Sequence, residues 1–215
     1  MRYTAVLLDF DGTVMQTGPG IQASLRHASE VTGHDYDFSK TWTYIGPPVD
    51  DFARIYLGLG EEEARQYVQL FRDFYRERSW RDSALYPGMR ELMLGLRERG
   101  VKVYIATSKP EKTTLSMVDY FDIPVDGVSG SHPERGLLEK DAIIREGGER
   151  FHIDLTRAVM VGDAPRDILG GRACGTDTIA VLYGYGLREE LLAARPTYAA
   201  ETVGELSALL LEDGK

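Results

Sequence analysis

The chain has 215 residues, 43% of them hydrophobic, which suits one large domain or a core domain with a modest second one. Its 34 acidic and 25 basic residues give a formal net charge of −9, which argues against general binding to nucleic acids or anionic membranes. The single cysteine, Cys174, permits no intrachain disulfide and favours a reducing compartment.

The first predicted element is a buried strand at residues 3–9, which overlaps the start of the run VLLDFDGTV at 6–14. Asp9 and Asp11 follow closely and interrupt the apolar run, so the start does not look like a signal peptide. No stretch approaches the roughly 18 apolar residues of a membrane span. We therefore expect a cytoplasmic protein with no membrane and no nucleic-acid partner. The two neighbouring aspartates repel each other, which suggests a bound cation.

Residues 16–82 show helical periods and no clear strand. Helices are expected at 20–32, 49–57 and 61–80. In the last of these, Ala64, Tyr67, Val68, Phe71 and Tyr75 fall on one side. The run IGPP at 45–48 predicts a rigid kink between helices. The pattern indicates a helical domain at 16–82, inserted into a core made of 1–15 and 83–215.

The rest of the chain alternates between helical patterns and apolar runs rich in Val and Ile. Strands are expected at 101–107, 125–129, 157–162 and 178–183, and helices at 88–99, 110–120, 138–150, 166–173 and 203–211. Nearly continuous apolar runs are typical of strands covered on both faces, as in a parallel sheet. The alternation predicts an α/β fold, a Rossmann-like parallel sheet core with an inserted α-helical domain.

Polar residues follow the ends of these strands. Because loops at the carboxyl ends of parallel strands converge, we expect these residues at one edge of the sheet. They are Asp9, Asp11, Gly12 and Thr13 after the first strand, Thr107, Ser108 and Lys109 after the second, Asp163 and Asp167 after the fourth, and Lys140 near a helix start. Lys109 is expected at the rim of the pocket, without an assigned part in the chemistry.

This grouping has a chemical logic. Several carboxylates with few histidines nearby suit Mg²⁺, which often also holds a phosphate oxygen. Hydroxyls, backbone N–H groups and a lysine are what a phosphate needs, and Gly12 allows close approach of the backbone. One carboxylate can then attack phosphorus, and a second can donate a proton to the leaving oxygen.

Four motifs resemble those of the haloacid dehalogenase superfamily, whose members are mostly phosphatases. DFDGT resembles its first motif, YIATSK its second and VGDAPRDI its fourth, and Lys140 in GLLEKDAII stands where the third-motif lysine belongs. The insert resembles the helical cap of the phosphoglycolate phosphatase group. IGPP, ATSKPE and LYGYG also look like that group and its nucleotidase-like relatives.

The resemblance implies catalytic roles for individual residues. Asp9 would be the nucleophile that forms an aspartyl-phosphate. Asp11 would be the general acid and then the base that activates water. Lys140 would neutralise the charge of the nucleophile and the phosphate. Thr107 and Ser108 would hold the phosphate.

The resemblance also implies a Mg²⁺ site. Asp9, the backbone carbonyl of Asp11, and Asp163 would be ligands. Asp167 would complete the metal site by orienting a metal-bound water or Lys140. Phe10 and Gly12 would contribute backbone groups to substrate binding.

The expected activity is Mg²⁺-dependent hydrolysis of a small phosphorylated metabolite, with phosphoglycolate and nucleoside monophosphates as first substrates to consider. A sugar phosphomutase of the same superfamily is the nearest alternative, followed by a non-catalytic protein that binds phosphate compounds. A haloacid dehalogenase would not need Asp11, and a phosphonate hydrolase would need a cap lysine, for which 16–82 offers only Lys40. We expect a monomer or a homodimer.

Overall fold

The computed structural model describes residues 2–34, 36, 37, 45, 49–137 and 139–211. The chain divides into two compact units, Met1–Met15 with Leu85–Lys215, and Gln16–Ala84. The boundary predicted from sequence at 82/83 lies two residues before the one in the structure. No helix among the described residues is long and apolar enough to cross a membrane.

The larger unit is built on a six-stranded sheet with the order β5-β4-β1-β6-β7-β8. The strands are β1 (Ala5–Leu8), β4 (Lys102–Pro110), β5 (Gly127–Ser131), β6 (Ala158–Gly162), β7 (Asp177–Val181) and β8 (Tyr198–Ala200). Neighbouring strands pair in parallel, and Leu8 of β1 lies beside Ile105 and Val161. The α/β fold with a parallel sheet is confirmed.

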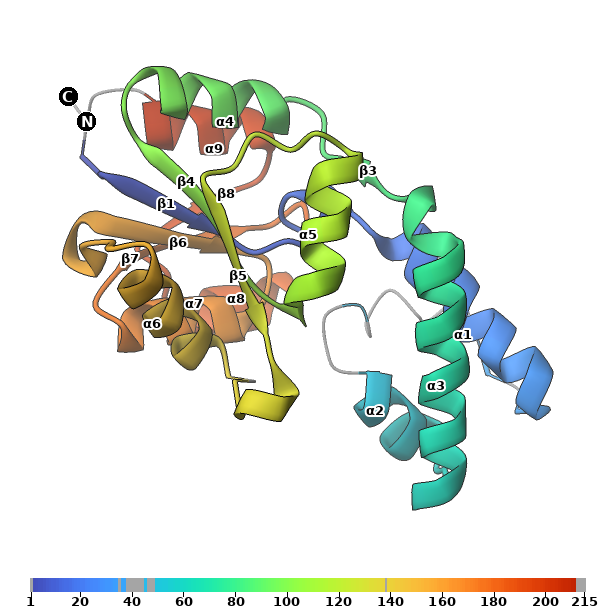
Figure 1. The fold of residues 1–215 in the computed structure, drawn as a ribbon. Helices are drawn as coiled ribbons and strands as arrows, with labels where there is room; N and C mark the ends of the chain where they lie inside the picture. Colours follow the sequence, from blue (N-terminus) through green and yellow to red (C-terminus); the bar gives the residue numbers. More distant parts are fainter. Residues whose placement is uncertain (1, 35, 38–44, 46–48, 138, 212–215) are drawn as a thin grey trace. The chain divides into compact units, whose positions relative to one another are not determined.

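Helices cover both faces of this sheet. They are α4 (Met89–Glu98), α5 (Glu111–Tyr120), α6 (Lys140–Arg150), α7 (Pro165–Ala173), α8 (Arg188–Ala193) and α9 (Val203–Leu211), with short 3₁₀ turns at Pro133–Arg135 and Leu155–Arg157. Figure 1 shows α4 and α9 on one face and α6 and α7 on the other. Every residue of β1 and β6 is buried, which is why these strands read as continuous apolar runs.

The helix expected at 110–120 begins one residue later. Pro110 ends β4 and precedes α5 with φ −54° and ψ 127°, an extended conformation that a helical residue does not adopt. Strand β8 and helix α8 were not predicted from sequence. With three and six residues, they are too short to show a recognisable period.

The smaller unit is helical. It contains α1 (Gly18–Thr32), α2 (Val49–Asp51), a π-helix (Phe52–Tyr56), α3 (Glu61–Glu77) and a 3₁₀ turn (Ser79–Asp82). The helix predicted at 49–57 is found at 49–56, but it is a π-helix from Phe52 onward. Helix α3 ends at Glu77, before the predicted end at residue 80. Of the predicted kink at 45–48, residues 46–48 lie outside the described residues.

Two very short strands lie where the chain passes between the units. Strands β2 (Met15–Gln16) and β3 (Ala84–Leu85) form a two-stranded sheet. The backbone N–H of Tyr86 donates to the carbonyl of Val14 at 3.1 Å next to this pair. The segments that enter and leave the smaller unit are therefore joined to each other by backbone hydrogen bonds.

Candidate active site

The strand order reverses direction beside β1. The chain builds outward from β1 to β4 and β5, then returns to place β6 on the other side of β1. Parallel sheets bind ligands at the carboxyl ends of strands at such a reversal. Asp9 and Asp163 come directly after β1 and β6, and the N–H of Asp9 donates to the carbonyl of Val161 at 2.9 Å.

Three carboxylates meet at this edge. One oxygen from each of Asp9, Asp163 and Asp167 lies within 4.8 Å of the others, and all three residues are buried. Burial, together with the charges of Asp9 and Asp167, raises the pKa of Asp163 to about 8. An all-oxygen donor set with excess negative charge fits a hard divalent cation.

Lys140 provides the positive charge within this cluster. It is the first residue of α6, and its Nζ lies 2.7 Å from Asp9 Oδ1 and 2.7 Å from Asp167 Oδ1. It also donates to the carbonyl of Ala106 at 3.0 Å. Burial opposes the charged ammonium, but the carboxylates of Asp167 and Asp9 outweigh it and raise the pKa of Lys140. Lys140 is therefore held as a cation against the predicted nucleophile.

Asp167 is fully buried in the first turn of α7. Its Oδ2 accepts the N–H of Ala164 at 3.0 Å, just before the helix begins, and its Oδ1 pairs with Lys140. A carboxylate near a helix N-terminus is stabilised by the backbone dipoles there. Both oxygens thus contact protein groups, an arrangement suited to orienting Lys140.

Asp11 has a partner that sequence reasoning did not assign. Lys109 Nζ lies 3.1 and 3.3 Å from the two Asp11 oxygens, and the two side chains are 7% and 16% exposed. Gly12 makes the turn after Asp11 with φ +80°, a conformation that glycine adopts readily. The only sequence signal for this pair is the position of Lys109 at the end of β4.

The predicted phosphate-binding residues lie at the ends of the same strands. Thr107 is buried in β4, and its Oγ1 accepts the N–H of Lys109 at 3.2 Å. Ser108 follows and is partly exposed. The side chain of Phe10 is fully buried, and its carbonyl accepts the N–H groups of residues 14 and 15 in the turn. The structure thus links Asp9, Lys140, Asp163 and Asp167 directly, and places the other predicted residues on adjoining segments.

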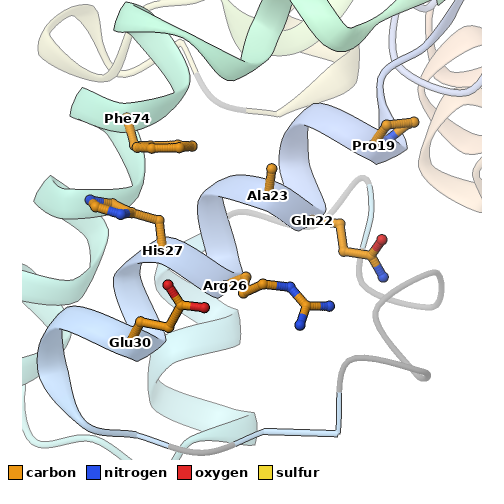
Figure 2. Close-up of a pocket in the computed structure, with 7 residues that line it drawn as sticks. All are labelled: Pro19, Gln22, Ala23, Arg26, His27, Glu30 and Phe74. Atoms are coloured by element: carbon orange, nitrogen blue, oxygen red, sulfur yellow. The ribbon is translucent and has the colours of Figure 1, made fainter.

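The smaller unit has a surface hollow of about 420 Å³ between α1 and α3, shown in Figure 2. Its lining residues are Pro19, Gln22, Ala23, Arg26, His27, Glu30 and Phe74. The rings of His27 and Phe74 stack with their centroids 4.2 Å apart. Its charged members, Arg26 and Glu30, are both exposed. The hollow lacks the buried charged groups found at the sheet edge, so the sheet edge is the candidate active site.

Comparison with known proteins finds relatives with three different named activities. The chain is 31% identical to a tyrosine-protein kinase PtkA of Mycobacterium tuberculosis, across 95% of this chain and 72% of that protein. It is 30% identical to a 5′-nucleotidase of Pseudomonas aeruginosa, across 98% and 96%. It is 27% identical to a phosphoglycolate phosphatase of Vibrio vulnificus, across 96% and 95%.

A solved structure shares the whole fold. A haloacid dehalogenase-like family hydrolase from Streptococcus pneumoniae superposes with a TM-score of 0.88 at 27% identity, covering 97% of this chain and 98% of that one. The family described as haloacid dehalogenase-like hydrolase matches residues 6–181, which include every predicted site residue. The chain therefore belongs to the haloacid dehalogenase-like hydrolase family.

Proposed function

We propose that the protein is a Mg²⁺-dependent phosphomonoesterase that acts on a small phosphorylated metabolite through an aspartyl-phosphate. One observation carries this proposal: a buried Asp9 carboxylate contacts Lys140 at 2.7 Å beside two further buried carboxylates. Asp9, Asp163 and the carbonyl of Asp11 would hold the ion. When bound, Mg²⁺ would neutralise the negative charge of the site and polarise a phosphoryl oxygen.

The first half of the reaction transfers the phosphoryl group to Asp9. An Asp9 oxygen forms a bond to phosphorus, and the bond from phosphorus to the ester oxygen breaks. Protonated Asp11 gives its proton to that leaving oxygen. Lys140 offsets the charge of Asp9 and the phosphoryl group, while Lys109 holds the Asp11 carboxyl group in place.

The second half regenerates the enzyme. Asp11, now a carboxylate, takes a proton from water as the water oxygen attacks phosphorus. The bond from phosphorus to Asp9 breaks, which releases inorganic phosphate and restores the Asp9 carboxylate. Buried surroundings strengthen these electrostatic contributions because little water screens them.

Phosphoglycolate and nucleoside monophosphates are the substrate classes we propose first, on the basis of two of the relatives' names. We also propose a cytoplasmic protein that acts as a monomer or homodimer without nucleic-acid or membrane partners. The sugar phosphomutase and the non-catalytic binding protein are the competing outcomes.

The test is phosphate release from a panel of phosphomonoesters, with Mg²⁺ and with EDTA. We expect Mg²⁺-dependent release that is strongest for one metabolite. Asp9→Asn should abolish it while the variant stays folded, and Asp119→Asn, an exposed change on α5, should not. Activity in Asp9→Asn would overturn the proposal. Isomerisation of a sugar phosphate with little phosphate release would favour the mutase.

A further inference from the structure

The loop at residues 183–186, Tyr-Gly-Tyr-Gly, lies at the same sheet edge but has no part in the mechanism above. We call it the YGYG loop. It follows β7, which pairs in parallel with β6, the strand that leads to Asp163. The run LYGYG resembles the phosphoglycolate phosphatase group and its nucleotidase-like relatives, but the resemblance implies no role for it. Its contacts converge on Asp163 and on the turn that holds Gly12 and Thr13.

The loop makes a short hydrogen bond to the buried carboxylate. The N–H of Tyr185 donates to Asp163 Oδ2 at 2.7 Å. On the other oxygen, the hydroxyl of Thr13 donates to Asp163 Oδ1 at 3.4 Å. The two oxygens are therefore oriented from two separate segments. A backbone N–H at this position could orient Asp163 whatever side chain the residue carries. The hydrogen bond alone therefore does not explain why the loop contains two glycines.

The two glycines explain the composition, because both pack directly on Asp163. A Cβ at Gly184 would lie 2.3 Å from Asp163 Cβ and 2.5 Å from the carbonyl oxygen of Gly12. A Cβ at Gly186 would lie 1.8 Å from the Asp163 carbonyl oxygen. Neither glycine has a positive φ, so space is the requirement at both positions.

Tyr183 fixes the start of the loop. Its hydroxyl donates to the carbonyl of Thr13 at 3.0 Å, and its ring centroid lies 4.7 Å from that of Tyr86. A tyrosine hydroxyl is protonated at neutral pH, and burial, with the nearby Tyr86 and Asp163, raises the pKa of Tyr183 further. The loop thus holds the DFDGT turn and Asp163 in one arrangement.

We propose that the YGYG loop is a positioning element of the metal site, which sets the place and rotation of the Asp163 carboxylate. This inference rests on the proposed Mg²⁺ site. Groups that orient metal ligands typically contribute about tenfold to a hundredfold in metal affinity. A Cβ atom added at Gly184 or Gly186 should displace Asp163 and weaken Mg²⁺ binding.

The test is isothermal titration calorimetry of MgCl₂ into the full chain after EDTA treatment and dialysis. We expect Gly184→Ala and Gly186→Ala to weaken Mg²⁺ binding by about tenfold or more. Tyr183→Phe, which removes one hydroxyl and adds no bulk, should weaken it by a smaller factor. Gly204→Ala is the control, because this exposed glycine of α9 has only ordinary contacts around it.

Circular dichroism and thermal melting without metal separate misplacement of Asp163 from failure to fold. If the alanine variants do not fold, Tyr183→Phe decides the matter. Wild-type affinity in the folded variants would overturn the role of the loop while leaving the proposed function intact. No Mg²⁺ binding by the wild-type chain would instead overturn the proposed Mg²⁺ site, and this inference with it.

Discussion

The two units differ in what they bury. At one sheet edge, the larger unit buries Lys140 and the carboxylates of Asp9, Asp163 and Asp167. Among its described residues, the smaller unit buries hydroxyl groups such as those of Ser24 and Ser79, but no charged side chain. Buried charges are costly unless they are paired, so they are retained where they have a use.

The hydrogen bonds show the same difference. In the smaller unit, Tyr67 donates to the carbonyl of Leu25 at 2.8 Å within an apolar core, and this bond satisfies a polar group. In the larger unit, three buried carboxylates lie together, and the ammonium of Lys140 pairs with two of them, those of Asp9 and Asp167. The proposed reaction would therefore take place in the larger unit. The predictions below test that division, starting with the largest expected effect.

Lys140→Met should lower kcat by about a hundredfold to a thousandfold, the loss seen when a charge-stabilising donor is removed. It should also lower Tm, because Asp9 and Asp167 would lose their shared cation. Phosphate-release kinetics and thermal melting check both effects. The control is Lys112→Met, an exposed lysine on α5. Equal kcat values for the two variants would contradict the role of Lys140.

Lys109→Met should lower kcat by about tenfold. A positioned proton donor raises the rate by about a hundredfold or more, and this variant should lose only part of that gain. The reason is that Asp11 would lose the ammonium that holds both of its oxygens. Mg²⁺ affinity should stay near the wild-type value, which distinguishes this variant from those in the YGYG loop. Steady-state kinetics and calorimetry measure the two quantities. A parallel loss of both would show that Lys109 supports the metal site instead.

The strands that lead to the site could be predicted because their burial on both faces leaves a continuous apolar run. This holds for β1, β4, β6 and β7, and the bounds of helix α9 agree with the predicted 203–211. The π-helix at Phe52–Tyr56 could not be predicted, because its apolar spacing is close to that of an ordinary helix.

The proximity of charged side chains in the candidate site could be predicted from their motifs, whereas their catalytic roles remain a proposal. Lys140 contacts Asp9 and Asp167, and the three residues come from motifs at the end of β1 and at the starts of α6 and α7. Two features were missed. The pairing of Lys109 with Asp11 depends on the path of the side chain, and the Tyr185 bond to Asp163 comes from a backbone N–H. Any residue type except proline can supply a backbone N–H, so the identity of residue 185 does not indicate this hydrogen bond. The neighbouring glycines are its only indication in the sequence.

The metal-free protein should lose stability as pH rises from about 4 toward about 8. Asp163 has its pKa raised to about 8, so the folded chain holds a proton that the unfolded chain releases. The resulting stabilisation is complete below the ordinary carboxyl pKa and is lost as pH rises through the folded value. Melting in EDTA across this range measures it. Asp163→Asn should lack this component, and Mg²⁺ should stabilise the wild type most at the alkaline end.

Tyr67→Phe should give the smallest effect, a loss of about 1 kcal/mol in the free energy of unfolding. The change leaves the buried carbonyl of Leu25 without its donor at 2.8 Å and removes a 3.0 Å partner of the Ser29 hydroxyl. Urea unfolding measures the loss, with Tyr120→Phe, an exposed position on α5, as the control. Because the smaller unit buries no described charge, kcat per folded molecule should stay at the wild-type value. A large fall in kcat would break the division between the units, since it would show that the core of the smaller unit contributes to the chemical step.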